Sequence, residues 1–482
     1  MRTSRCHPIR ALLVLGALSG GLAACSGGGD SAAPTQGVVP PPGGGPPPPG
    51  VANVVFARNV ATSPPPNLDL FLVKEDGTGM VPLASAAPQV EVYVGATGSK
   101  VIYLACNPFN SRCDLQSVNQ DGSGVLPLAM DIRPAPILVV GGRIVYGKSV
   151  GGPSGQNDIY SVAPTGGSPV ELAVTTDNEN LIAGAVVGTR VVYVRRTNGQ
   201  NDLYSVDVSG GGGSAPLGIS AADETFRGLL SNRVLFERTV AGQGDVFSVT
   251  ADGGDLRNVA TTPDDETIVG QAGDRLVYAR RVSGQDDLWS VNADGASPLP
   301  LTTAPEDESF EGASSSLVFY KRTVNGQGDL YSVPVLGGAV STLAVTLNDE
   351  DFQGIVNNRV IYSVRMSVDN NDLRAVDLTG GNDTGLAVTA DNEVYAGGIG
   401  NRVVFVQCGP LCDVMTVGTD GSGKIAVANS ANQESVRALT SSRILYVEEI
   451  AGQKDLFAIS PDGTGRIPLA STTLDEDFAG LF

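Results

Sequence analysis

Hydrophobic and polar residues alternate along most of the chain, in short runs separated by Gly, Asn and Asp. Residues 223–262 contain four such runs, ETFRGLL, RVLFERTV, DVFSVTA and LRNVAT, which we call strands A, B, C and D. Successive side chains of a strand point to opposite faces, so this alternation between turn residues predicts strands joined by tight hairpins. We find no stretch with a helical period, and the pattern therefore predicts an all-β chain.

The four-strand unit is repeated ten times. Four strands in a period of about 40–45 residues are typical of a propeller blade. We therefore expect residues 53–482 to form a β-propeller of about ten four-stranded blades. An Asp opens strand C of each copy, at Asp69, Asp114, Asp158, Asp202, Asp245, Asp287, Asp329, Asp372, Asp413 and Asp455.

The two ends of the repeat series predict how the propeller closes. The series begins near Asn53 with VVFAR, which aligns with strand B, and it stops at residues 475–482, which align with strand A. We expect the C-terminal strand to complete the N-terminal blade of a single ring. Ten blades exceed the usual four to eight, so two five-bladed propellers are the alternative. No linker interrupts the series, which favours one ring.

Two copies carry a resemblance to a known repeat. DLWSVNADG at 287–295, with LTT at 301–303, and DLFAISPDG at 455–463 resemble the WD-like repeats of TolB-type propellers. The TolB-type pattern has Ser-Pro-Asp-Gly before strand B, whereas this chain has Glu-x-aromatic-x-Gly there. The resemblance therefore implies the fold, and the partners of TolB are not carried over.

The N-terminal segment is typical of an export signal. Residues 1–24 combine three Arg with an apolar run that is too short to span a bilayer, and they end in Leu-Ala-Ala before Cys25. This resembles the bacterial lipobox, which implies cleavage and lipidation at Cys25; Ser26 implies the outer membrane, facing the periplasm or the cell surface. The alternative is an ordinary signal peptide with a chance Cys. Residues 25–52 are rich in Gly and Pro, which predicts a tether.

The composition narrows the function classes. The chain has 31 Lys and Arg residues and 51 Asp and Glu residues, so its net charge is −20. This negative charge argues against nucleic-acid binding. The single His, His7, lies in the export signal. A mature chain without imidazole excludes Ser-His-Asp machinery and His-ligated metals, so we expect no enzyme and no cofactor. Calcium is the alternative, because it binds several oxygen ligands, although no EF-hand spacing is present.

Charged residues recur at fixed positions of the blade. A Glu near the start of strand A, an Arg at the end of strand B and the repeat Asp of strand C should cluster at one blade edge, as in Glu224, Arg238 and Asp245. The loops from strand D to strand A contain further Asp and Glu residues on the same face. On the opposite face, Arg residues stand at the start of strand B. We expect one face to be acidic and to attract a basic partner; the alternative is a solvated rim. The candidate residues of this face are Glu179, Glu224, Asp265, Glu266, Asp307, Glu308, Glu350, Glu393 and Glu476.

Two further features complete the expectations for the blade. In strand A, an apolar residue and then a Gly follow the Glu at intervals of two, which predicts all three on one side of the strand, with the apolar residue packed between blades. Cys106 and Cys113, like Cys408 and Cys412, bracket the loop from B to C. In an oxidising compartment we expect one disulfide between Cys106 and Cys113 and another between Cys408 and Cys412.

These features favour an outer-membrane lipoprotein whose propeller is a scaffold for envelope proteins, held at the membrane only by its lipid. Two alternatives remain: a carbohydrate-binding or carbohydrate-active propeller that uses the central channel, and a cation-binding propeller.

Overall fold

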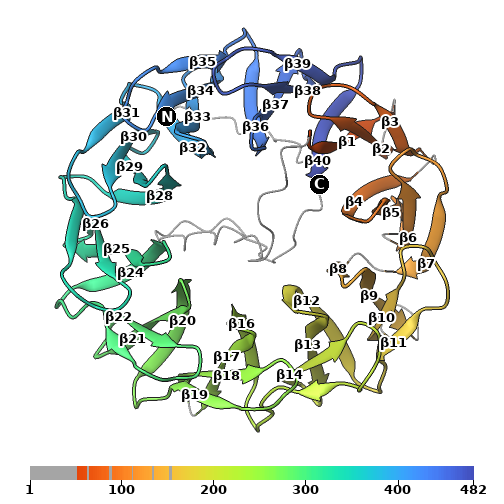
Figure 1. Cartoon of the computed structure of the whole chain (residues 1–482), viewed down its shortest axis with the longest axis horizontal. Helices are drawn as coiled ribbons and strands as arrows, with labels where there is room; N and C mark the ends of the chain where they lie inside the picture. Colours follow the sequence, from red (N-terminus) through yellow and green to blue (C-terminus); the bar gives the residue numbers. More distant parts are fainter. Residues whose placement is uncertain are drawn as a thin grey trace, which may run out of the picture. The chain divides into compact units, whose positions relative to one another are not determined.

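The computed structural model describes residues 51–61, 65–85, 89–110, 112–132, 135–150, 155–240 and 242–482. Cys25, the export signal and nearly all of the tether lie outside these residues. Forty β-strands and no helix are found in the described part of the chain. The unit Val51–Phe482 is a ring of ten blades, numbered here from the blade that holds Asn53 and Leu481. Figure 1 shows the A strands lining the inside of the ring and the D strands lying outermost.

The A and B strands form the inner half of each blade. From blade 1 to blade 10, the A strands are β40 (Asp475–Leu481), β4 (Val90–Thr97), β8 (Leu138–Val140), β12 (Asn178–Val187), β16 (Glu224–Leu230), β20 (Asp265–Ala272), β24 (Asp307–Ala313), β28 (Glu350–Val356), β32 (Asn392–Ile399) and β36 (Gln433–Leu439). In the same order, the B strands are β1 (Asn53–Asn59), β5 (Lys100–Asn107), β9 (Arg143–Val150), β13 (Arg190–Thr197), β17 (Arg233–Val240), β21 (Arg275–Val282), β25 (Leu317–Val324), β29 (Arg359–Ser367), β33 (Arg402–Cys408) and β37 (Ile444–Ile450).

The C and D strands form the outer half. The C strands are β2 (Leu68–Lys74), β6 (Arg112–Asn119), β10 (Gln156–Val162), β14 (Gln200–Asp207), β18 (Gln243–Thr250), β22 (Gln285–Asn292), β26 (Gln327–Pro334), β30 (Asn370–Asp377), β34 (Cys412–Gly418) and β38 (Gln453–Ile459). The D strands are β3 (Val81–Ala84), β7 (Leu126–Ile132), β11 (Val170–Ala173), β15 (Ala215–Pro216), β19 (Arg257–Ala260), β23 (Leu299–Pro300), β27 (Ser341–Ala344), β31 (Thr384–Ala387), β35 (Ile425–Ala428) and β39 (Ile467–Ala470).

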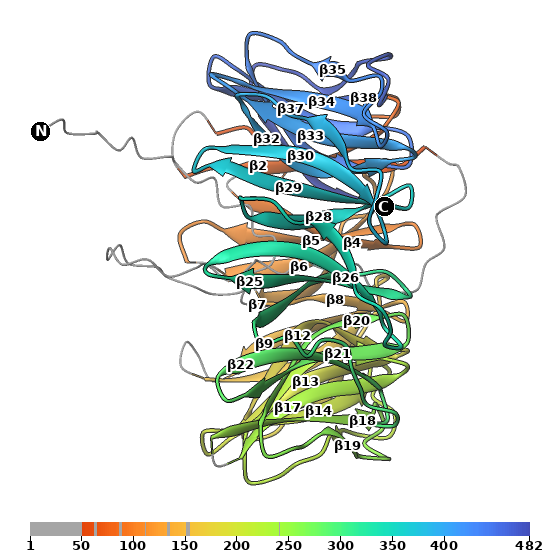
Figure 2. The ribbon, with the colours of Figure 1, turned by 90° about the vertical axis from the view of Figure 1, so that its left-hand side faces the viewer.

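Neighbouring strands of a blade are antiparallel and cross the thickness of the ring, as the edge-on view in Figure 2 shows. The B–C and D–A loops therefore share one face, which we call the B–C face, and the A–B and C–D turns share the other. One parallel bridge, between Leu68 and Val90, links blades 1 and 2 into an eight-stranded sheet. The all-β propeller predicted from the repeat is confirmed.

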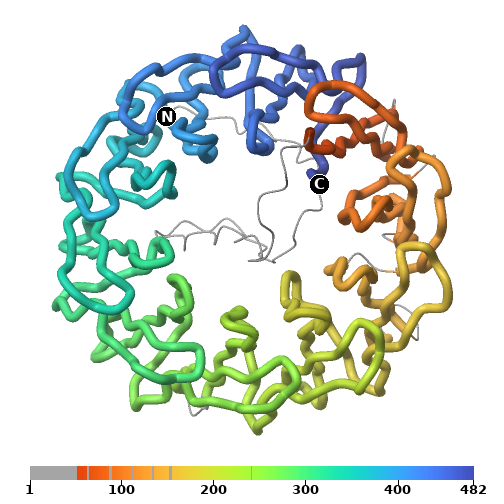
Figure 3. The backbone as a smooth tube through the Cα atoms, viewed as in Figure 1, coloured from red at the N-terminus to blue at the C-terminus, as the bar shows by residue number. Residues whose placement is uncertain are grey.

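The blades form one closed ring. Strand β40 pairs with β1, with Arg58 opposite Glu476, so the C-terminal strand completes blade 1 (Figure 3). The described residues form ten apolar clusters, and each cluster joins one blade to the next. The cluster between blades 10 and 1 contains Phe56 and Leu445, and the cluster between blades 5 and 6 contains Leu235 and Tyr278. A split into two five-bladed rings would leave such clusters exposed.

Strand A differs from the sequence expectation by a β-bulge. In β24, Glu308 and Phe310 lie opposite Arg322 and Tyr320, but Gly312 lies opposite Phe319 because the register shifts after Phe310. The bulge turns the Gly to the other side of the strand, so the prediction that all three residues share one side is wrong. One strand thereby presents an aromatic ring to the preceding blade and a Gly to the following blade.

Replacing Gly312 by Ala should destabilise the ring by about 1–3 kcal/mol, because a Cβ there would lie 2.4 Å from Cε1 of Phe352 in the next blade. Thermal and urea unfolding measure the change. Gly228 is the matched control: it holds the same place in β16, and a Cβ there meets nothing within 4 Å. Adding Phe352→Leu should recover part of the lost stability. Equal losses in the two Gly variants would contradict this packing.

Candidate functional site

The predicted charge cluster forms on the B–C face of blades 1, 4, 5 and 7, where the Arg at the end of strand B pairs with the strand A Glu. In blade 5, Glu224, Arg238 and Asp245 lie directly opposite one another on three adjacent strands. Arg238 forms an ion pair with Glu224 at 3.2 Å, and its guanidinium lies 4.5 Å from the ring centre of Phe247. Blade 6 departs from this arrangement, because Arg280 pairs with Asp264 in the D–A loop at 2.6 Å.

The strand A glutamates lie inside the blade interfaces, where they cannot meet a partner. Thr346, four residues before Glu350, donates to the Glu350 carboxylate at 2.5 Å from Oγ1 to Oε1, while Oε2 is buried without a hydrogen-bond partner. The candidates that are at most 2% exposed are Glu179, Glu224, Glu266, Glu308, Glu350, Glu393 and Glu476. This placement corrects the expectation that these seven carboxylates form an exposed acidic face.

Burial also changes the acidity of these glutamates. Desolvation raises the pKa of Glu224, Glu308 and Glu350 to about 7. The repeat Asp of the preceding blade adds to the shift: Asp329 raises the pKa of Glu350, and Asp202 raises that of Glu224. Each of these three blade interfaces therefore joins two carboxyl groups, and Glu224, Glu308 and Glu350 retain a proton up to near neutral pH.

The Asp residues that open strand A fasten one blade to the next. Asp265 of blade 6 accepts a hydrogen bond from the backbone N–H of Gly244 in blade 5 at 3.0 Å, and Asp307 accepts from Asp286 N–H at 3.2 Å. Asp265 and Asp307 are exposed candidates of the acidic face, and both carry this structural bond. Some of the carboxylates of this face therefore stabilise the contact between neighbouring blades.

A Gln that opens six of the C strands was not predicted as part of the site. The Nε2 group of Gln285 donates to the carbonyl oxygen of Glu306 and to Oδ1 of Asp287, both at 3.3 Å, and so ties the D–A loop to the repeat Asp. The recurrence of Gln two residues before the Asp was a signal that could have identified it. The same residues are Gln156, Gln200, Gln243, Gln327 and Gln453.

The Arg residues of the opposite face are structural as well. Arg275 donates to Ser290 Oγ of strand C at 3.2 Å, and Ser290 donates onward to the carbonyl of Val335 in the next blade at 2.6 Å. Arg275 is 5% exposed. Arg275 therefore holds strand C and the blade interface together, and little of its charge reaches the solvent.

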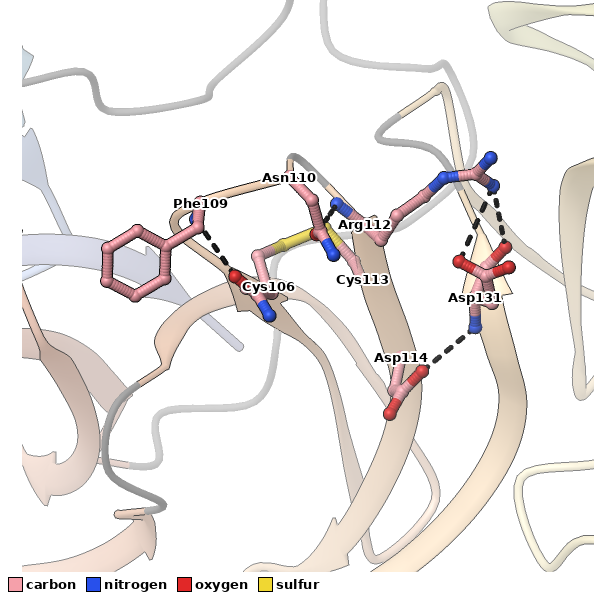
Figure 4. Close-up of a disulfide and its surroundings, with 8 residues drawn as sticks. Cys106, Phe109, Asn110, Arg112, Cys113, Asp114 and Asp131 are labelled. Atoms are coloured by element: carbon pink, nitrogen blue, oxygen red, sulfur yellow. Dashed lines mark hydrogen bonds and ion pairs between the residues drawn. A yellow bond between two sulfur atoms is a disulfide. The ribbon is translucent and has the colours of Figure 1, made fainter. Parts of the chain in front are cut away.

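The two expected disulfides join Cys106 to Cys113 and Cys408 to Cys412 across the ends of the B–C hairpins of blades 2 and 9. Figure 4 shows the first loop, in which Asn110 accepts from the backbone N–H of Arg112 at 3.0 Å. The side chain of Phe109 points away from this loop and is 75% exposed.

Two cavities lie where the repeat pattern is incomplete. One, of about 140 Å³, borders blade 3, whose strand A is only the three-residue β8; Gly147, Ser149 and Glu179 help to line it. The other, of about 270 Å³, lies beside the Cys408–Cys412 loop of blade 9. Gln407, Asp391 and Asp413 are among its lining residues.

The described residues contain no helix that is long and apolar enough to cross a membrane. Within the same part of the chain, no three His, Cys, Asp or Glu side chains gather closely enough to hold a metal ion.

Comparisons with known proteins return structural neighbours only. No family model matches the chain, and no curated protein matches it. The tricorn protease is 14% identical with a TM-score of 0.31, over 85% of this chain and 44% of that chain. Puromycin hydrolase is 15% identical with a TM-score of 0.33, over 66% and 58% of the two chains. A TolB-like protein from Agrobacterium tumefaciens is 17% identical with a TM-score of 0.27, over 44% and 83%. The chain spans about half the length of the first two.

These neighbours contradict the expectation that the chain is not an enzyme. Solved structures that resemble it include a protease, a hydrolase and prolyl endopeptidases. The expectation rested on the lack of His, which excludes only His-dependent machinery. We therefore do not maintain it. At these identities and TM-scores, the likenesses assign no activity to this chain.

Proposed function

We propose that this protein is an outer-membrane lipoprotein, anchored through Cys25, whose ten-bladed ring is a scaffold that binds other envelope proteins on its B–C face. The observation that carries the proposal is the exposure of large apolar side chains at loop tips of that face. Phe109, Leu347 and Val368 are 75%, 93% and 94% exposed, and all three lie in B–C or D–A loops. Leu347 and Val368 lie in the two loops that lead into β28 and β30 of the same blade, where they offer a partner the apolar contact that protein interfaces bury.

The sequence adds the location. The lipobox at Cys25 and the Gly/Pro-rich segment that follows it would hold the ring near the envelope proteins that it binds. The rigidity of the ring supports the same function, because hydrogen bonds and apolar clusters at the blade interfaces keep the loops in fixed relative positions. A fixed surface binds with a small loss of conformational entropy.

The test places a photo-crosslinking amino acid at position 109, 347 or 368 of the full chain in intact cells. Leu336 is the matched control, since it is 68% exposed in a C–D turn on the opposite face. We expect discrete crosslinked proteins from the three B–C face positions and none from position 336. Adducts of equal yield from both faces, or none at all, would overturn the scaffold. Cys25→Ser should in addition move the protein from the membrane fraction to the soluble fraction.

A further inference from the structure

Blade 8 exposes three large apolar side chains on two neighbouring loops of the B–C face. Leu347 lies in the D–A loop that leads into β28, Met366 lies near the end of β29, and Val368 lies in the turn from β29 to β30. Their exposed fractions are 93%, 51% and 94%, respectively. Asn348 donates from Nδ2 to the sulfur of Met366 at 3.6 Å. This contact fastens the two loops together, so the three apolar side chains form one surface, which we call the blade 8 patch.

The repeat shows that the apolar residue of the D–A loop is particular to blade 8. Leu347 lies three residues before the strand A Glu, Glu350. In the other blades with this Glu, the same position holds Thr, Ala or Pro, as Pro88, Thr176, Ala221, Pro263, Pro305, Ala390, Ala431 and Thr473. Because the Leu347 side chain is almost fully exposed, packing inside the ring does not account for it.

The hairpin from β29 to β30 departs from the repeat as well. Blades 4, 6, 7 and 10 close this hairpin with two residues at positive φ, the second a Gly: Asn198-Gly199, Ser283-Gly284, Asn325-Gly326 and Ala451-Gly452. Blade 8 has one residue more, and its register shifts between Arg365 and Ser367, around Met366. Its turn residues are Val368 and Asp369, and neither has a positive φ. The altered turn therefore places a β-branched apolar residue where other blades have Asn, Ser or Ala.

The charges around the patch favour a basic partner. Asp369 is exposed beside Val368 and takes part in none of the ion pairs formed among the described residues. Arg365 is already shared by Asp349 and Asp351, at 3.8 and 3.6 Å. A second copy of the chain would bring the same carboxylates against these, and three side chains cover far less than the ~800 Å² that each partner of a stable dimer buries.

We propose that the blade 8 patch binds a short segment of a partner protein in which a large apolar side chain stands next to a Lys or Arg. The apolar side chain packs between Leu347 and Val368, over Met366, and the Lys or Arg pairs with Asp369. Removing apolar surface from water stabilises the complex, and the ion pair at its rim selects the charge of the partner. The inference rests on the proposed scaffold function and names the partner chemistry that one blade recognises.

The test selects binders for the full chain, at physiological salt, from a phage-displayed library of random twelve-residue peptides. We expect the enriched peptides to place Leu, Ile, Phe or Met beside Lys or Arg. Fluorescence anisotropy then measures the binding of the most enriched peptide. Leu347→Thr combined with Val368→Asn gives blade 8 the residues of blade 4, Thr176 and Asn198, and should weaken binding at least tenfold. Leu336→Thr, on the opposite face, should change binding less than twofold.

Asp369→Asn tests the charge that the patch recognises. This variant should weaken binding severalfold and reduce its dependence on salt, whereas Glu171→Gln, at an exposed position of β11, should change binding less than twofold. Melting curves verify that each variant is folded. Three results would overturn the site: no enriched peptide or enriched peptides without Lys or Arg, equal binding by the wild type and the double variant, or a loss that Leu336→Thr reproduces.

The scaffold proposal is read separately, from the crosslinks in intact cells. If the crosslinks from positions 109, 347 and 368 form while no peptide depends on Leu347, Val368 and Asp369, only the blade 8 inference is wrong. If such peptides bind and the crosslinks are absent, the scaffold is wrong.

Discussion

Removing the last eleven residues, 472–482, is expected to open the ring and to abolish its cooperative unfolding transition. The truncated chain loses β40, which pairs with β1 and contributes Phe478 and Leu481 to the cluster between blades 10 and 1. It also loses the ion pair between Arg58 and Glu476 at 2.9 Å. Two apolar side chains and a row of strand hydrogen bonds together stabilise the ring by roughly 5 kcal/mol or more. The exposed edge of β1 should then promote aggregation.

A synthetic peptide of residues 472–482 should restore the transition when it is added to the truncated chain. It carries Thr472, which donates to Glu476 at 2.5 Å, and all of β40. The matched control is the same peptide with Gly480→Val, because a Cβ at this Gly would lie 2.2 Å from Cε1 of Tyr93 in blade 2. Calorimetry and light scattering measure both effects. A truncated chain that melts like the full chain would show that β40 does not close the ring.

The fold could be predicted because the same order of four strands occurs in ten copies. A chance pattern in one copy would not occur in the other nine. The bulge in strand A was not predictable from the period alone. It is a one-residue event between Phe310 and Gly312, and the spacing of the side chains looks the same with or without it. Only the partner strand, through Phe319 opposite Gly312, reveals that the Gly faces the other way.

The candidate site was predicted only in part. The sequence did not reveal that the repeated Glu residues are buried, or how much space is left where blade 9 has no strand-end Arg. Repeated Glu residues were expected at the surface because burying a carboxylate costs free energy; Glu350 is buried because Thr346 donates to one oxygen and the carboxyl can hold a proton. The cavity of about 270 Å³ beside the Cys408–Cys412 loop lies where blade 9 has Gln407 in place of the strand-end Arg. The absence of the strand-end Arg at Gln407 is visible in the sequence, but a shorter side chain gives no measure of the space it leaves.

The buried glutamates predict that the ring loses stability as the pH rises from about 5 to 8. Glu224, Glu308 and Glu350 have a pKa of about 7 in the folded chain against an ordinary value of 4.5, so each takes up a proton on folding between these values. The resulting stabilisation is complete below about pH 4.5 and is lost as the pH rises through 7. It amounts to an order of 1 to 3 kcal/mol for each group.

Other carboxylates lower the stability of the folded chain at acidic pH. Hydrogen bonds from Ser209 and Thr189 lower the pKa of Asp207 to about 2, and Thr78 lowers that of Asp76. Groups with a lowered pKa stabilise the folded chain above their ordinary pKa, and this contribution is lost as the pH falls through the folded value. The two effects oppose each other, so the melting temperature should pass through a maximum near pH 5.

Glu350→Gln tests the origin of the alkaline loss. The amide keeps the size of the side chain and can accept the Thr346 hydrogen bond, but it carries no charge next to Asp329 and Asp349. We expect this variant to unfold at a higher temperature than the wild type at pH 8 and to lose less stability between pH 5 and 8. Glu171→Gln, at an exposed position of β11, should change the slope between pH 5 and 8 far less than Glu350→Gln does. An identical slope in the wild type and Glu350→Gln would show that the buried carboxyl is ionised throughout this range and that the loss arises elsewhere.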